Sequence, residues 1–271
     1  LNHKPAPRSV PHYPQQGVIA RYAQGRDYHK TLRKRLQQFA EKIKFEVNDI
    51  GYRAFVDSAP ILERAIAEQA GLGWIGKNTM LINKQAGSFF FLGELFTNLP
   101  LIPDQPVNHH CGSCTACIDI CPTQAIVAPY QLDARLCISY LTIEYNGSIP
   151  IELRPLIGNR IFGCDDCQLI CPWNRYAKLS AEDDFKARHG LDNLSLLALF
   201  AWDEATYLHK TEGSPIRRIG YEGFMRNIAI GLGNAPFDKQ IVQALHHKKQ
   251  NMSILVQEHI DWAKKRKKSL L

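Results

Sequence analysis

The sequence predicts a mixed α/β or α+β domain, followed by a cysteine-rich segment and a helical region at the carboxyl end. Strand-like and helix-like segments alternate through the first hundred residues, and all eight cysteines lie between Cys111 and Cys171. Beyond them, apolar residues recur at helical spacing. With 271 residues, 45% of them hydrophobic, the chain can bury a core. We therefore expect three parts, over residues 1–100, 101–178 and 179–271.

The amino-terminal part combines a basic helix with short strands. Its expected elements are, in order, a basic amphipathic helix over 27–45, a strand over 51–57, a helix that begins near Pro60, and strands over 80–83 and 88–95. The first helix carries Leu32, Leu36 and Phe39 on one apolar stripe. The segment 51–57 alternates apolar and polar side chains, as a half-buried strand does.

The carboxyl-terminal region shows helical spacing over 194–207, 215–232 and 238–246. The basic run over 264–268 is interpreted as a solvated tail. No apolar run reaches the roughly 18 residues of a membrane-spanning helix. The polar, proline-rich stretch 1–17 also lacks the apolar core of a secretory signal. These features predict a cytoplasmic protein with no membrane contact.

The cysteine spacing is the most specific signal in the chain. Cys111, Cys114, Cys117 and Cys121 are spaced C-x2-C-x2-C-x3-C and are followed by proline. Bacterial ferredoxins use this spacing, in which three close thiolates hold one [4Fe–4S] cluster and the fourth reaches a second cluster. Eight thiols confined to one stretch of the chain also favour metal over disulfides.

A second, incomplete copy of this pattern follows. Cys164, Cys167 and Cys171 repeat C-x2-C-x3-C before a proline, and Cys137 is the cysteine left to complete the set. The predicted ligands are Cys111, Cys114, Cys117 and Cys171 for the first cluster, and Cys121, Cys137, Cys164 and Cys167 for the second. The alternative is a pair of zinc sites, because C-x2-C pairs also hold Zn²⁺. Two low-potential clusters imply electron delivery.

The residues alone leave the electron acceptor open. Residues 71–76 spell G-x-G-x-x-G, but a predicted helix precedes them and a strand follows. This order reverses the context of a dinucleotide-binding site. We interpret the segment as a loop whose glycines permit tight turns.

Five motifs together resemble the epoxyqueuosine reductases. They are GRDYHK at 25–30, FVDSAP at 55–60, GLGWIGKNT at 71–79, CISYLTIE at 137–144 and GCDDCQ at 163–168. The resemblance implies an oxidoreductase that reduces epoxyqueuosine to queuosine in the anticodon loop of tRNA, with cobalamin and two [4Fe–4S] clusters. It also implies a catalytic domain related to reductive dehalogenases. Members of the family extend further upstream, so the chain is expected to be truncated at its amino end.

The resemblance assigns the proton donor of this reaction to Asp57, in the FVDSAP motif. Opening an epoxide requires a proton on the departing oxygen, and a carboxyl can supply it where apolar surroundings favour its neutral form. From the residues alone, the simpler interpretation is that Asp57 or Ser58 caps the helix expected near Pro60.

The resemblance also implies a set of cobalamin contacts, which from the residues alone are ordinary core or loop positions. Leu32 replaces the glycine of the D-x-H-x-x-G element that begins at Asp27. We therefore expect base-off cobalamin without a histidine ligand, and His29 is interpreted as a structural or surface residue. The implied contacts are Ala20, Asp57, Leu81, Leu92, Ser139, Cys164 and Asp165.

Basic side chains are the candidate contacts to nucleic acid. The 33 Lys and Arg against 26 Asp and Glu give a formal net charge of +7. Two clusters of about −2 each would offset much of it, so local patches should matter most. The candidates are Arg64, Arg217, Arg218 and the basic helix, each of which is alternatively an ordinary solvated residue.

The expected partners are a tRNA that carries epoxyqueuosine and an external low-potential electron donor, with the chain itself a monomer. Two other functions stay open. One is cobalamin-dependent reductive dehalogenation of a small molecule on the same scaffold. The other is a non-catalytic ferredoxin-like electron carrier, or a zinc-based module that binds tRNA.

Overall fold

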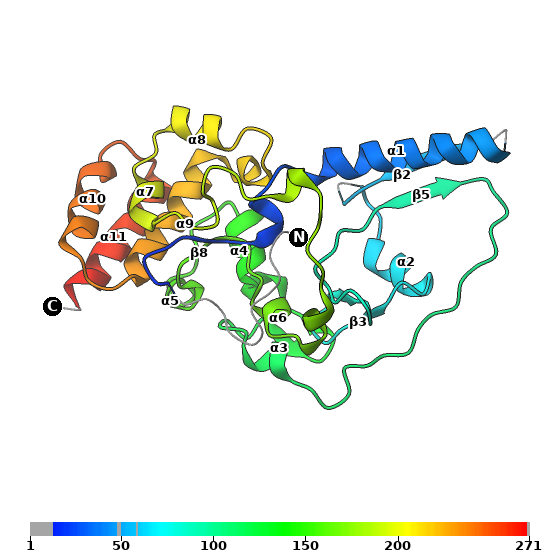
Figure 1. Ribbon diagram of the computed structural model, residues 1–271. Helices are drawn as coiled ribbons and strands as arrows, with labels where there is room; N and C mark the ends of the chain where they lie inside the picture. The colour runs from blue at the N-terminus through cyan, green and yellow to red at the C-terminus, as the bar shows by residue number, and fades with distance from the viewer. Residues whose placement is uncertain (1–12, 48–49, 58, 270–271) are drawn as a thin grey trace.

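The computed structural model describes residues 13–47, 50–57 and 59–269. The helical region forms one end of the molecule, and the long helix α1 (Tyr28–Val47) extends from the opposite side (Figure 1). The helical region consists of α7 (Leu196–Phe200), α8 (Glu204–Lys210), α9 (Gly220–Asn234), α10 (Lys239–Lys249) and α11 (Ile254–Lys268). No helix in the described part of the chain is long and apolar enough to cross a membrane.

Capping residues divide the first predicted helix of this region. The segment 194–207 forms two helices, because Ser195 and Asp203 each accept a hydrogen bond from the backbone N–H three residues further on. The predicted helix over 215–232 begins with a 3-10 turn, Pro215–Ile219. Gly220, at φ 66°, then redirects the backbone into α9.

The basic carboxyl end is helical, so the prediction of a solvated tail is wrong. It forms the last turns of α11, which buries Val256, Ile260 and Ala263 on one face. Lys267 is also buried, and its ammonium donates a hydrogen bond to the carbonyl of Ala235. Burial lowers the pKa of Lys267 to about 8. The apolar spacing of this helix is present in the sequence, but the basic run obscures it.

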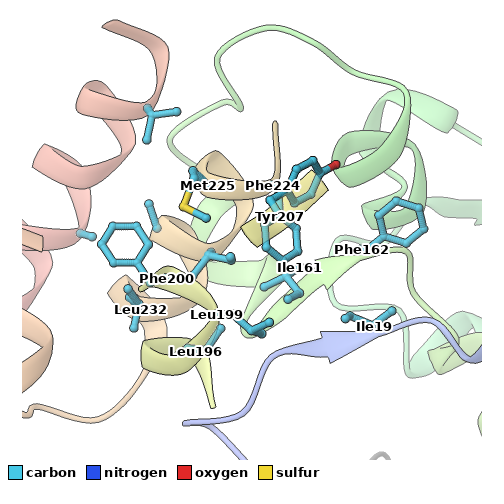
Figure 2. Packing of buried hydrophobic residues seen from close by; sticks show 14 of the residues in the cluster. Ile19, Ile161, Phe162, Leu196, Leu199, Phe200, Tyr207, Phe224, Met225 and Leu232 are labelled. Carbon is cyan, nitrogen blue, oxygen red and sulfur yellow. The ribbon is translucent and has the colours of Figure 1, made fainter. Parts of the chain in front are cut away.

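Helix α9 is the centre of the main core, because its residues 224–233 are all buried. Figure 2 shows Phe224 of this helix among Phe200, Tyr207 and Ile161, which belong to other elements of the same core. Strand β1 (Val18–Ile19) pairs in parallel with β8 (Arg160–Phe162), and both strands contribute to this core. The core therefore draws on all three predicted parts of the chain, whose boundaries stay a prediction.

The amino-terminal part is α+β. Strand β2 (Tyr52–Phe55) pairs antiparallel with β5 (Glu94–Thr97), and α1 packs against this ribbon. Helix α2 (Glu63–Gln69) packs against a second antiparallel ribbon, formed by β3 (Trp74–Ile75) and β4 (Leu81–Ile82). Both ribbons are antiparallel, as in α+β folds, whereas β1 pairs in parallel with β8, which lies outside this part.

Three details of this part differ from prediction. The strand expected over 88–95 begins later, at β5. Ser88 and Phe89 are buried, but they lie in irregular chain before this strand. Phe39 is 57% exposed and leaves the predicted stripe, whereas Ala40 is fully buried. The helix expected near Pro60 begins at Glu63.

The cysteine-rich segment is built from short elements. Its α4 and α5 pack on the buried Ile230 of α9. The elements are α3 (Ala116–Asp119), β6 (Ile126–Ala128), β7 (Gln131–Leu132), α4 (Ile138–Ile143), α5 (Arg154–Ile157) and α6 (Asp166–Leu169).

Candidate functional site

The cysteine-rich segment contains a structural repeat that matches its sequence repeat. Helices α3 and α6 lie side by side (Figure 1). The carbonyls of Thr115 and Asp165 each accept the N–H groups three and four residues on. Each turn then closes with a cysteine N–H, at Cys121 and Cys171, bonded to the carbonyl three residues before it. Two short scaffolds of the same backbone geometry thus present the thiols.

One small cavity collects cysteines from both copies of the repeat. Its volume is about 240 Å³. The thiol-bearing residues in its wall are Cys111, Cys114, Cys117 and Cys171, the predicted ligands of the first cluster. The fold thus brings Cys171 of the second copy beside the first three cysteines, and the assignment of these four to one cluster stays a prediction.

Of the other four cysteines, three lie beside α4 and α6 and one follows α3. Cys137 immediately precedes α4, while Cys164 and Cys167 flank the start of α6. Burial, and next the neighbouring Cys137, raise the pKa of Cys167. Cys121, at the end of the first repeat, accepts a hydrogen bond from the N–H of Ala125 at 3.3 Å.

The four cysteines of the small cavity lie close to one another, and all but Cys114 are partly buried. Burial, followed by the neighbouring Cys171 and Cys111, raises the pKa of Cys117 to about 11. Crowded, buried thiols of this kind need a metal to become thiolates. Among the described residues, no three His, Cys, Asp or Glu side chains lie close enough to hold a single metal ion. The compact three-cysteine run and the x3-Cys-Pro step, which zinc sites do not need, favour a cluster over zinc.

Two larger cavities, of about 670 Å³ and 1010 Å³, share the side chains of Tyr22, Tyr28 and Asp57. The first has a mainly apolar wall that includes Ile61, Met80 and residues 89–92. The second is lined by five basic residues, Arg26, Lys30, Arg188, Arg217 and Arg218, and besides Asp57 by three acidic ones, Asp27, Glu144 and Glu212. A carboxyl group thus lies between an apolar cavity and a basic one.

Asp57 is held by the GRDYHK segment. The Tyr28 hydroxyl donates a hydrogen bond to Asp57 Oδ2 at 2.6 Å, and His29 Nε2 lies 3.2 Å from the same oxygen. The other ring nitrogen, His29 Nδ1, is 2.6 Å from Asp27 Oδ1. His29 therefore bridges two carboxylates in the wall of the second cavity, which agrees with the structural half of its interpretation as a structural or surface residue.

The backbone at Asp57 is unusual for a residue that carries a side chain. Its φ of 45° lies in the left-handed region, which is uncommon outside glycine and recurs at functional sites. Its side chain does not cap α2, whose N-cap is Leu62 and has no side-chain cap. The alternative cap, Ser58, lies outside the described residues.

A second carboxyl pair adjoins Asp57. Glu63 accepts a hydrogen bond from the Asp57 backbone N–H. Burial, followed by the neighbouring Glu63 carboxylate, raises the pKa of Glu94 to about 7. Burial and the bond to Asp57 raise the pKa of Tyr28, so its hydroxyl remains a donor at neutral pH. The site can therefore hold protons close to Asp57.

The predicted cobalamin contacts divide into two groups. Leu92 and Asp165 join Asp57 in the wall of the first cavity, and Ser139 lines the second. Asp165 accepts the Arg21 N–H at 2.8 Å, and burial raises its pKa to about 6. Three predicted residues line neither of these cavities: Ala20, Leu81 and Cys164. Ala20 and Leu81 are buried, as core residues are.

The predicted basic contacts are exposed side chains at the cavity walls. Arg64 lines the first cavity and donates a hydrogen bond to the Thr79 carbonyl. Arg217 and Arg218 line the second cavity, and Arg218 pairs with Glu144 at 3.0 Å. All three are therefore available to a ligand.

The sequence interpretation did not assign roles to Tyr28, Glu63, Glu94 or Lys77. Tyr28 and Lys77 lie within the GRDYHK and GLGWIGKNT motifs, so the signal was present. Glu63 and Glu94 lie in no motif that pointed to a function. Glu63 follows Asp57 by six residues, and Glu94 comes close to Glu63 only through the fold.

Asp165, which follows Cys164, lines the first cavity, so the cysteine-rich segment adjoins that cavity. A paired cysteine repeat beside a large cavity with a carboxyl group is the arrangement of an iron–sulfur oxidoreductase. The family model "4Fe-4S double cluster binding domain" matches residues 110–174, and "Epoxyqueuosine reductase QueG, DUF1730" matches residues 1–58. Epoxyqueuosine reductase of Pseudomonas aeruginosa is 61% identical over 93% of this chain and 70% of its own length. That of Xanthomonas campestris is 61% identical over 93% and 71%. The chain belongs to the epoxyqueuosine reductase family.

Solved structures of epoxyqueuosine reductases have the same fold. The Bacillus subtilis protein matches with a TM-score of 0.88 and 31% identity, over 98% of this chain and 71% of that one. A structure with an epoxyqueuosine-modified tRNA stem loop matches with a TM-score of 0.81 and 28% identity, over 99% and 80%.

Proposed function

We propose that this chain reduces epoxyqueuosine to queuosine in the anticodon loop of tRNA, with cobalamin in the first cavity and Asp57 as the proton donor. The single observation that carries this proposal is the position of Asp57, between a large apolar cavity and a basic one. The proposal draws further support from the solved relative with a modified tRNA stem loop.

The first cavity fits a flat, mostly apolar macrocycle. Aromatic and aliphatic side chains make up most of its wall, and Leu92 and Asp165 are among the residues that would hold cobalamin there. Cobalamin, when bound, supplies low-valent cobalt as the source of electrons for the epoxide. His29 already bonds two carboxylates through its two ring nitrogens, which supports base-off cobalamin without a histidine ligand.

The chain's own residues would supply the protons. Removal of an epoxide oxygen as water takes two electrons and two protons. The acid that donates the first proton must therefore be supplied with a second one. Asp57 donates to the departing oxygen, and His29, at 3.2 Å from Asp57 Oδ2, returns a proton to it. The Tyr28 hydroxyl keeps the carboxyl oriented. A relative from Bacillus subtilis, described with a catalytic loop that carries an aspartate, supports this role.

The second cavity would take the anticodon loop. Its basic wall can contact phosphates, and a base turned out of the loop could reach Asp57 from it. Arg217 and Arg218 are the proposed phosphate contacts, and Arg64 is the proposed contact within the first cavity. A cavity of about 1010 Å³ with this basic wall favours tRNA over a small organohalide.

The cluster ligands complete the proposal. The first cluster is held by Cys111, Cys114, Cys117 and Cys171, and the second by Cys121, Cys137, Cys164 and Cys167. The clusters, when assembled, supply single electrons from an external low-potential donor. We propose that the chain acts in the cytoplasm as a monomer, with the three parts 1–100, 101–178 and 179–271 as its functional divisions.

The test is anaerobic reconstitution with iron, sulfide and cobalamin, followed by turnover of tRNA that carries epoxyqueuosine. We expect visible spectra of both cofactor types and conversion to queuosine under a strong reductant. Asp57→Asn should retain both spectra and lose at least a hundredfold in rate, because general acid catalysis typically contributes that much.

The matched control is Asp192→Asn, which changes an exposed aspartate that lines neither large cavity. It should turn over like the unmodified chain. Incorporation of both clusters without affinity for any cobalamin would refute the proposal. An unchanged rate in the Asp57→Asn variant would refute only the proposed role of Asp57 as proton donor.

A further inference from the structure

Lys77 is a lysine with almost no access to solvent. The residue is 9% exposed and lies near the start of the loop between β3 and β4. The Lys77 ammonium donates hydrogen bonds to the carbonyls of Gly112 and Cys114, at 2.6 Å and 3.0 Å. Two of its three N–H groups therefore hold the backbone loop that carries the first cysteines.

No carboxylate in the described residues pairs with Lys77. A buried charge without a counter-charge is costly, and such charges normally pair or face a metal site. Two neutral carbonyls solvate the ammonium but do not balance it. The fold thus places an uncompensated positive charge inside the protein.

The negative charge that balances Lys77 is expected in the small cavity that Lys77 helps to line. The same wall contains Cys111, Cys114, Cys117 and Cys171, and no acidic side chain of the described chain joins them. Arg175, the other cation in that wall, is exposed and donates to the Tyr176 hydroxyl. A [4Fe–4S] cluster with four thiolates carries a net charge of about −2.

We infer that Lys77 is the counter-cation of the first cluster and raises its reduction potential, so that this cluster accepts the incoming electron first. One electron from an external one-electron reductant adds a negative charge to the cluster, and no bond forms or breaks. A nearby buried positive charge favours that reduced state. The inference rests on the cluster assignment of the proposed function.

The second cluster has a different environment. Arg160 lies beside Cys164, but its guanidinium also pairs with Asp166. Its positive charge is therefore balanced by a carboxylate before any cluster is considered. Among the described residues, Lys77 is therefore the buried cation that faces a set of cysteines without a carboxylate partner.

The experiment is a redox titration of the full chain with both clusters assembled, followed by electron paramagnetic resonance. Lys77→Gln keeps an amide donor for the two carbonyls and removes the charge. One of the two midpoint potentials should fall, with a loss of at least tenfold in the reduction equilibrium. A unit charge within about 10 Å, at an effective dielectric of about 20, has an effect of this size. Tenfold corresponds to about 59 mV for a one-electron couple.

Three further variants and one assay separate the outcomes. Lys77→Arg should retain the original potential, because the charge is kept, and Lys77→Met should reproduce the shift. Lys84→Met, which changes an exposed lysine in the turn that follows β4, should leave both potentials unchanged. Unchanged potentials in a Lys77→Gln protein with full iron content would overturn the inference.

Loss of the first cluster in both neutral variants, with retention in Lys77→Arg, would show a purely assembling role and also overturn the inference. A chain that assembles no clusters at all would instead refute the proposed function. Iron and sulfide analysis distinguishes the two failures.

Discussion

Asn227 links the helical core to the backbone that carries the second set of cysteines. It is fully buried in α9, and its Nδ2 donates to the carbonyls of Thr142 and Ile161, at 2.8 Å and 2.9 Å. Thr142 Oγ1 in turn accepts the N–H of Gly163, the residue before Cys164. We predict that Asn227→Ala destabilises the fold and loosens the second cluster.

The expected loss follows from the bonds that disappear. Two backbone carbonyls lose their donor in a region closed to water, and each unsatisfied buried group costs about 1–3 kcal/mol. The side-chain oxygen of Asn227, which accepts from the Arg226 guanidinium at 3.0 Å, is lost as well. Allowing for relaxation, the free energy of unfolding should fall by about 3 kcal/mol.

Urea unfolding of the anaerobic, cluster-loaded chain, followed by circular dichroism, measures this loss. Bleaching of the visible absorbance in air reports the second effect, and it should be faster in Asn227→Ala. Asn251→Ala, which changes an exposed asparagine, should stay within about 0.5 kcal/mol of the unmodified chain. A loss below about 1 kcal/mol, with unchanged bleaching, would refute the proposed link.

Two further predictions concern burial and close packing. Burial lowers the pKa of His259 to about 4, although the hydrogen bond to the Leu255 carbonyl opposes this shift. Nε2 accepts the Ile149 N–H, which leaves no place for a second proton. The unfolded histidine titrates near 6.5, so stability is full above that pH and is lost as pH falls toward 4, by about 2 kcal/mol between pH 7 and pH 5. Urea titrations should show this dependence, and His259→Gln should weaken it; an equal slope in both proteins would contradict the assignment. Gly73→Ala should disrupt the β3–β4 ribbon, because its Cβ would lie 2.3 Å from the Ile82 carbonyl oxygen. The melting temperature should fall, and an unchanged value would show that the ribbon can shift.

Local patterns predicted the parts of this protein that depend on neighbouring residues. The spacing of the cysteines showed a repeat, and in the structure one cavity collects Cys171 with Cys111, Cys114 and Cys117. Helical spacing located α1, α9 and α10 to within a few residues. Such signals survive because a short turn or a helix is stabilised mainly by contacts close in the chain.

The identity of Asp57 as a candidate acid came from a motif, whereas its surroundings came from the fold. Tyr28, His29 and Glu94 reach Asp57 from other segments, through contacts that no local pattern encodes. For the same reason, the interpretation of His29 as a structural or surface residue named no partner for its ring.

By itself, the sequence determined the cysteine repeat, the main helices and the motif that contains Asp57. Only the tertiary structure decided that the amino-terminal ribbons are antiparallel, that the basic carboxyl end packs as a helix, and that Lys77 is buried without a carboxylate. Strand pairing and the burial of a charge depend on partners far apart in the chain, and their free energy is set when those partners meet.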